Sequence, residues 1–220
     1  MMKIIYPNYL SRTLIFVVQA LDGIPGKYYA QPKAKLIHGQ LVVRDGQSNS
    51  ESTFSHKLVA GIEDKFDRAN WHIDKQYETE ISKQIIFRND EKRATYGPTF
   101  NLLWDTAPSE KEEFYGIPDI VIHAGQDNCQ QQNQVFIAEL KTTPALTQDQ
   151  FDVDLFKTAV YHDDLLFCFS AFIIVNVPEN DIRAMFRAYR SNGYYLSGRR
   201  GMYIITKNGY DNPTRVYRIN

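Results

Sequence analysis

The amino-acid sequence predicts a mixed α/β fold in which helices flank a central mixed sheet. One observation behind this is a series of short apolar or alternating runs of strand length. Another is that longer segments lie between them, with apolar residues spaced as on one face of a helix. From about residue 51 the predicted order is α-β-β-β-α-β, followed by one more helix and one more strand. Such an order predicts a single core with additions at both ends of the chain.

The first predicted helix covers residues 55–69, and we expect Ser55 to be its N-cap. Its apolar residues recur at helical spacing, at Leu58, Val59, Ile62, Phe66 and Ala69. Residues 71–77 follow and alternate between apolar and polar, as in a half-buried strand. The order therefore begins with a helix and then a strand.

Two further strands are predicted on either side of residues 125–134, which we expect to connect them as a hairpin. Asp119 stands at the start of the first, and the second ends in Glu139 and Lys141. Because strand side chains alternate, Glu139 and Lys141 should share a face with Val135 and Ile137. A charge on such an apolar face is unfavourable unless it is paired, hydrogen-bonded or bound to a metal.

The remaining elements follow in close succession. Thr147 is expected to cap a helix that runs to about residue 162, and residues 165–177 form an apolar, β-branched and aromatic run typical of a central strand. An amphipathic helix is predicted over residues 180–190, and the last strand over residues 202–206. These elements complete the predicted sheet and its helical layers.

Domain organisation is predicted to be simple. Residues 51–220 should form one domain, within which residues 88–116 are a possible insertion. Residues 1–50 should be an N-terminal extension or an elaboration of the core. They contain a strand or helix at residues 13–21 and a strand at residues 40–44.

Composition limits the class of protein. With 220 residues, 43% of them hydrophobic, the chain can bury one sizeable core. Two cysteines do not make a disulfide framework, so we expect a reducing, cytoplasmic setting. The longest apolar run near the N-terminus, residues 14–18, is too short for a signal peptide or a membrane span. No membrane association is therefore expected.

The charged residues of the predicted hairpin indicate a chemistry. Asp119 and Glu139 could hold a divalent cation, with the Lys141 amine beside it. Oxygen donors without a nearby thiolate or imidazole pair favour Mg²⁺ or Mn²⁺ over Zn²⁺. On spacing alone, an ordinary salt bridge between Glu139 and Lys141 at a strand edge is the alternative.

The residues Pro118 and Asp119, the run Glu139-Leu140-Lys141 and the α-β-β-β-α-β order together make residues 51–178 resemble the PD-(D/E)XK nuclease superfamily, which has the restriction-endonuclease-like fold. The resemblance implies a metal-dependent nuclease that hydrolyses phosphodiester bonds in DNA, as an endonuclease of restriction, repair, recombination or mobile elements. An RNA-directed nuclease is one alternative. A noncatalytic nucleic-acid-binding or assembly protein of the same fold is another, and the presence of all three charged residues argues against it.

The resemblance also implies roles for single residues. Asp119 and Glu139 would bind Mg²⁺ or Mn²⁺, with the backbone carbonyl of Leu140 as a further ligand. Lys141 would position or help to deprotonate the attacking water and offset charge on the phosphate. Glu63 is the candidate for an additional metal-binding carboxylate from the first helix, and an exposed helix carboxylate is its alternative interpretation.

Three polar residues on the helix after Lys141 are candidates for a supporting role. Asp154, Lys157 and Tyr161 recur at positions i, i+3 and i+7, so all three could face the same cleft. An ordinary surface ion pair between Asp154 and Lys157 is the competing interpretation.

Charge is distributed unevenly, although the net charge is only −1. Residues 183–220 contain eight Lys and Arg against one acid, whereas residues 105–164 contain twelve acids against three bases. This distribution predicts nucleic-acid contact by the basic segment, with a solvated basic face as the alternative. The candidate residues for this contact are Arg183, Arg187, Arg190, Arg199 and Arg200. DNA is the expected partner, RNA is not excluded, and a homodimer is left open.

Overall fold

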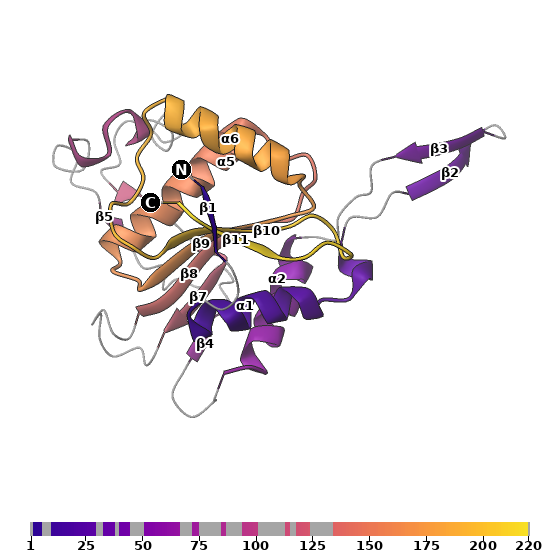
Figure 1. The fold of residues 1–220 in the computed structure, drawn as a ribbon, viewed down its shortest axis with the longest axis horizontal. Coiled ribbons are helices and arrows are strands. Elements are labelled where there is room, and N and C mark those ends of the chain that lie inside the picture. The colour runs from indigo at the N-terminus through magenta and orange to yellow at the C-terminus, as the bar shows by residue number, and fades with distance from the viewer. Residues whose placement is uncertain are drawn as a thin grey trace.

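A central sheet lies between two layers of helices in the computed structural model of the chain (Figure 1). The structure describes residues 2–5, 10–29, 51–66, 94–99, 118–123 and 134–219, together with the backbone of residues 33–37, 40–44, 72–74, 85–86, 100 and 113–114. This arrangement confirms the predicted mixed α/β class with a sheet flanked by helices.

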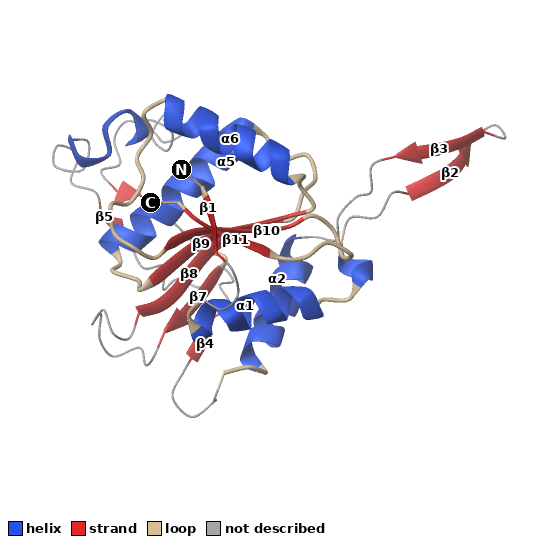
Figure 2. Cartoon of the chain, viewed as in Figure 1, coloured by secondary structure: helices blue, strands red, loops and turns tan. Residues whose placement is uncertain are grey.

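The elements follow one another along the chain in a fixed order, which Figure 2 shows by type. They are β1 (Lys3–Ile5), α1 (Arg12–Gly23), the 3₁₀ turn η2 (Gly26–Tyr28), β2 (Lys33–Ile37), β3 (Gln40–Arg44), α2 (Glu51–Glu63), β4 (His72–Asp74), β5 (Ile85–Ile86), the 3₁₀ turn η3 (Gly97–Phe100), β6 (Glu113–Phe114), β7 (Ile120–His123), β8 (Gln134–Lys141), α5 (Gln148–Asp164), β9 (Phe169–Val175), α6 (Glu179–Ser191), β10 (Met202–Lys207) and β11 (Arg215–Arg218).

The main sheet has seven strands in the order β1-β11-β10-β9-β8-β7-β4. Its three central strands, β8, β9 and β10, are parallel, and the helices α5 and α6 connect them in turn. The outer strands β7 and β4 on one side, and β11 and β1 on the other, pair antiparallel. Two smaller antiparallel pairs lie outside this sheet, and one of them, β2 with β3, extends away from the body of the molecule (Figure 1).

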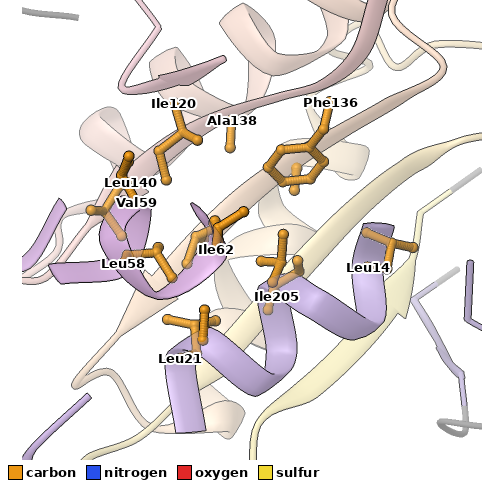
Figure 3. Packing of buried hydrophobic residues seen from close by; sticks show 14 of the residues in the cluster. Leu14, Leu21, Leu58, Val59, Ile62, Ile120, Phe136, Ala138, Leu140 and Ile205 are labelled. Carbon is orange, nitrogen blue, oxygen red and sulfur yellow. The ribbon is translucent and has the colours of Figure 1, made fainter. Parts of the chain in front are cut away.

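Each face of the sheet is covered by one pair of helices. Helices α1 and α2 pack on one face, where Figure 3 shows Leu14, Leu21, Leu58 and Ile62 against Ile120, Phe136, Ala138 and Ile205. Helices α5 and α6 pack on the other, with Phe151, Leu155, Ile182 and Phe186 near Phe172, Ile174 and Ile204. None of the helices in the described residues is long and apolar enough to cross a membrane.

Helix α5 begins where the sequence predicts. The Thr147 side chain accepts a hydrogen bond from the Gln150 N–H (3.3 Å), and the Gln150 side chain accepts one from the Thr147 N–H (3.1 Å). This reciprocal pair is a capping box, which satisfies two helix-terminal donors. The predicted helix over residues 180–190 is also confirmed, as α6.

Other element boundaries differ from the prediction. Helix α2 begins at Glu51 and not after Ser55, which lies buried within the helix. The strand predicted from residue 165 starts only at Phe169, because Leu166 adopts a left-handed conformation (φ 57°) that interrupts extended backbone. Strand β10 is not the last, because β11 follows it and pairs with β1. Residues 13–21 are helical, within α1.

The hairpin of β7 and β8 is confirmed, and its connection, residues 124–133, lies outside the described residues. Its pairing contains one irregularity. Ile122 lies opposite Phe136 and His123 opposite Gln134, so Val135 has no partner on β7. Such a bulge disturbs side-chain alternation. Val135 accordingly packs with Phe136 in the cluster under α1 and α2, and not with Ile137 as predicted.

Candidate active site

Asp119 is held against the end of β8 by two hydrogen bonds. Its N–H donates to the Ala138 carbonyl (3.0 Å), and its carboxylate oxygen Oδ2 accepts a hydrogen bond from the Leu140 N–H (2.7 Å). In an antiparallel pair a residue's N–H and C=O point to the same side. The Leu140 carbonyl therefore points to the same side as Asp119.

Glu139 and Lys141 lie on the face of β8 that α5 covers, as side-chain alternation predicts. Glu139 is 2% exposed, while the Lys141 side chain is 21% exposed, so Glu139 is the more deeply buried of the two. β8 pairs with β9 on its other side and Glu139 lies opposite Phe172, so the strand is held along both edges. A central strand thus carries two charged side chains at its carboxyl end, where it emerges from the core.

Helix α5 brings its three predicted polar residues to the same place. Lys157 Nζ lies 3.2 Å from Asp154 Oδ1 and 3.8 Å from Glu139 Oε2, and Lys141 Nζ lies 3.5 Å from Asp154 Oδ2. The Asp154 and Tyr161 side chains are buried, and Lys157 is largely so. The expected ion pair between Asp154 and Lys157 does form, but it is a partly buried link between Glu139 and Lys141 and not a solvated surface pair.

Helix α2, the first helix of the predicted order, contributes a carboxylate that the prediction missed. Glu51, the first residue of α2, accepts a hydrogen bond from Lys141 Nζ at 3.1 Å. Glu63, the predicted contributor, is exposed at the other end of the helix, about 18 Å away along its axis. The prediction placed the helix start at Ser55, so Glu51 was not considered. An acidic residue in the first turn of a helix is the signal that could have identified it.

These side chains form one group, called here the charged cluster, that consists of Glu51, Asp119, Glu139, Lys141, Asp154 and Lys157. It contains four carboxyl groups and two amines, so it would carry a net charge of −2 if all were ionised. Its most buried acid is Glu139. The Glu139 carboxyl group and the neighbouring Tyr161 hydroxyl are both shielded from solvent, so they face each other in the interior.

The surroundings shift two acids of the cluster, Asp119 and Glu139, towards protonation. Burial raises the pKa of Asp119 to about 6, although the hydrogen bond from the Leu140 N–H acts in the opposite direction. Burial also raises the pKa of Glu139, and Lys157 offsets this only in part. Both shifts come first from burial, and the other carboxylates of the cluster add to them.

Lys141 responds differently to the same surroundings. Burial opposes its charged form, but the carboxylates of Asp154 and Glu51 outweigh this and raise its pKa above the ordinary value. Lys141 is therefore a fixed positive charge at neutral pH.

The cluster offers oxygen ligands rather than a complete metal cage. Among the residues that the structure describes, no three His, Cys, Asp or Glu side chains are arranged to hold a metal ion. Asp119 and Glu139 supply carboxylate oxygens, and the Leu140 carbonyl points to the edge of β8 that faces Asp119. Such a donor set suits a cation that keeps several waters, because Mg²⁺ usually takes only one or two protein carboxylates.

The five arginines of the predicted basic surface fall into two groups, those with partners in the protein and those that are exposed. Arg183 Nε donates to Glu179 (2.7 Å), and its guanidinium lies over the Tyr217 ring. Arg199 donates to the His162 carbonyl (2.6 Å), in the last turn of α5. Both arginines therefore have structural partners. The remaining candidates, Arg187, Arg190 and Arg200, are exposed.

Comparison with protein-family models, with curated proteins and with solved structures finds no match to this chain. The charged cluster is therefore interpreted from its own geometry and charge.

Proposed function

We propose that the chain is a Mg²⁺- or Mn²⁺-dependent nuclease that hydrolyses phosphodiester bonds in DNA, with the charged cluster as its active site. The observation that carries this proposal is the buried carboxyl group of Glu139, which interacts with the charge of Asp119 and pairs only loosely with Lys157 Nζ, at 3.8 Å. A buried acid of this kind is unfavourable on its own. A cation shared with Asp119 would compensate it.

The order and pairing of the elements support the same proposal. Helix α2 precedes the antiparallel strands β4, β7 and β8, and α5 then leads to β9, which is parallel to β8. Strands β5 and β6 lie between β4 and β7 in the chain and pair only with each other, so the remaining elements agree with the α-β-β-β-α-β order that the sequence predicts. On this view, β1 and α1 are N-terminal additions, and α6, β10 and β11 are C-terminal ones.

Asp119, Glu139 and the Leu140 carbonyl would hold the cation. Their oxygen donors fit Mg²⁺ or Mn²⁺, which prefer carboxylate, carbonyl and water ligands. When bound, the cation would supply Lewis-acid chemistry to the hydrolysis. The β7–β8 pairing fixes the backbone from which these ligands project, so the protein would not need to reorganise it for each reaction.

Lys141 would act as a charge and not as a base in this proposal. Glu51 and Asp154 hold its ammonium group in place and keep it protonated. An ammonium group fixed beside the carboxylates can orient a water and stabilise negative charge that develops on the phosphate. Lys157 has a different task, because it lies nearest to Glu139 and Asp154 and partly neutralises them.

A cleavage assay with matched variants tests the proposal. Purified protein is incubated with supercoiled, linear and single-stranded DNA and with RNA, in Mg²⁺, Mn²⁺ or chelator. We expect DNA cleavage that needs the metal and is lost in Asp119→Asn and in Glu139→Gln. Absence of metal-dependent cleavage on every substrate would refute the enzyme, and cleavage of RNA alone would refute the choice of DNA.

Helix α2 provides an internal control for the role of Glu51. Glu51→Gln should lower the cleavage rate about tenfold or more, because Lys141 loses one of its two carboxylate partners. Glu63→Gln removes the same charge from the exposed end of the same helix and should leave the rate unchanged. Equal effects of the two substitutions would show that Glu51 has no special position.

A further inference from the structure

A second polar site lies on the side of the sheet covered by α1 and α2. It is a pocket of about 490 Å³ between the end of α1, the turn η2 and the outer part of α2. Its size is within the usual range for ligand sites. We call it the lysine pocket after three of its lining residues, Lys27, Lys57 and Lys65.

The close packing of α1 and α2 forms the floor of the lysine pocket. Gly61 of α2 faces Ala20 of α1, and a Cβ atom at Gly61 would lie 3.2 Å from the Ala20 Cβ. Buried apolar residues of the two helices, Leu21 of α1 and Leu58 of α2 among them, also pack in one cluster (Figure 3). The pocket is therefore built on two helices that the core holds in place.

The lining of the pocket is positively charged. Three lysines stand against one acid, Asp64, in a chain whose net charge is −1. Lys57 and Lys65 are exposed, and neither forms an ion pair with a carboxylate in the described part of the chain. This differs from Arg183 and Arg199, which have partners within the protein. The pocket therefore favours an anionic ligand.

Aromatic rings accompany these charges. The ammonium groups of Lys27 and Lys57 lie 5.2 Å and 5.6 Å from the centre of the half-exposed Tyr28 ring. Tyr210, 51% exposed, lies against the same turn, because a Cβ at Gly26 would be 3.1 Å from its ring. Positive charge together with exposed aromatic rings is how proteins bind single strands of nucleic acid without reading their sequence.

We propose that the lysine pocket binds the phosphate backbone of a nucleic-acid strand, with Lys57 and Lys65 against the phosphates and a base stacked on Tyr28. The choice of a strand as ligand rests on the proposed nuclease function. Lys57 lies six residues after Glu51 on α2, about 9 Å along the helix axis, so this helix contributes to both the pocket and the charged cluster. A strand anchored in the pocket would follow α2 towards Glu51 to reach the charged cluster.

Equilibrium binding in chelator tests this proposal without cleavage. The probe is a fluorescently labelled 20-nucleotide single strand, titrated with the full-length protein at several salt concentrations. We expect the double variant Lys57→Gln, Lys65→Gln to bind at least about tenfold more weakly. Its salt slope should fall by about 1.4, that is, about 0.7 for each phosphate contact. Tyr28→Leu should weaken binding with an unchanged slope, because stacking releases no counterions.

Lys3→Gln is the matched control, because it removes an exposed positive charge from β1, outside the pocket. It should change the affinity less than twofold. If the double variant bound as well as the wild-type protein, with the same salt slope, the proposal would be wrong.

Chemical protection gives a second test, on the wild-type protein. Acylation of Lys57 and Lys65 is followed by mass spectrometry in the presence of the single strand, of AMP or of inorganic phosphate. Protection by the strand at lower concentration than by AMP supports a strand site. Protection by AMP or phosphate but not by the strand would assign the pocket to a free ligand and overturn the proposal, as would no protection by any probe.

The two proposals fail in different ways. Wild-type protein that binds the strand through the lysine pocket but cleaves no substrate in Mg²⁺ would refute the nuclease and retain the pocket. Metal-dependent cleavage with binding unaffected by the pocket variants would refute the pocket and retain the nuclease.

Discussion

Lys141 and Lys207 stand at the ends of two parallel strands, β8 and β10, which lie on either side of β9. The surroundings of the two lysines differ. Lys207, at the end of β10, donates to Asp22 (2.9 Å) and to the Asn212 carbonyl (2.6 Å), and the Thr214 hydroxyl also donates to Asp22. One amine thus faces one carboxylate and one backbone carbonyl. Lys141, at the end of β8, belongs to a cluster with four acids and two amines.

The comparison shows that a charged strand end does not by itself make a functional site. The Lys207 side chain is only 4% exposed, less than that of Lys141, yet its bonds serve to join α1 to the connection between β10 and β11. A buried charge is tolerated when it is paired and hydrogen-bonded. The charged cluster differs because it contains four carboxyl groups for two amines, an excess of acid that a cation could balance.

The largest expected effect comes from Lys141→Met. In the proposed nuclease this change removes the fixed positive charge at the reacting phosphate, so the single-turnover cleavage rate should fall by about 100-fold or more. The free energy of unfolding should also fall, because Glu51 loses the lysine with which it pairs while Asp154 keeps Lys157, so the rate is compared on folded protein. A variant that cuts at the wild-type rate would remove Lys141 from the mechanism.

The counterpart is Lys207→Met, which should act on stability alone. It breaks the bonds to Asp22 and Asn212, and we expect a loss of about 1–3 kcal/mol in the free energy of unfolding. For a chain of this size the melting temperature should fall by roughly 2–4 °C per kcal/mol. The cleavage rate, measured well below that temperature, should equal the wild-type rate. Loss of cleavage in a fully folded Lys207→Met protein would contradict the comparison.

Glu139→Gln tests the buried acid directly. In chelator at neutral pH the variant should be more stable than the wild-type protein by about 1 kcal/mol, because glutamine avoids the cost of burying or protonating a carboxyl group whose pKa is raised by burial. Mg²⁺ should raise the melting temperature of the wild-type protein and leave that of the variant unchanged. Asp149→Asn, on the exposed first turn of α5, is the control and should keep the Mg²⁺ response. An equal Mg²⁺ response in Glu139→Gln would place the cation elsewhere.

Thr147→Ala should give the smallest effect. It removes the capping box of α5, and we expect a loss of about 0.5–1 kcal/mol in the free energy of unfolding. Asp154 and Lys157 lie two or more turns further along the helix, so cleavage should stay within about twofold of wild type. A larger loss of cleavage, measured on folded protein, would mean that the cluster depends on the start of α5 and is less rigid than the hydrogen-bonded group around Lys207.

Much of the candidate site follows from local periodicity. The two-residue repeat of a strand places Glu139 and Lys141 on one face, and helical spacing places Asp154, Lys157 and Tyr161 on another. The structure brings these two faces together. The capping pattern of Thr147 and Gln150 likewise marks the start of α5 correctly, because both partners lie within one turn.

Other features depend on residues far apart in the sequence. Glu51 reaches Lys141 across 90 positions, and no local pattern distinguishes it from Glu63. The pairing of β1 with β11 joins the two ends of the chain, and a bulge moves Val135 out of the expected alternation. Prediction failed at these points because local spacing carries no information about which helix end meets which strand end.

The sequence by itself determined which residue types share a strand or helix face, since that depends only on the repeat of the backbone. It therefore specified that Glu139 and Lys141 lie on one face at the end of β8. The tertiary structure alone decided the charge balance around each lysine. Lys207 obtains its single acid from α1, 185 residues away, whereas Lys141 meets acids from α2 and α5 together. That balance depends on how the helices pack against the sheet, which is settled only when the whole core forms.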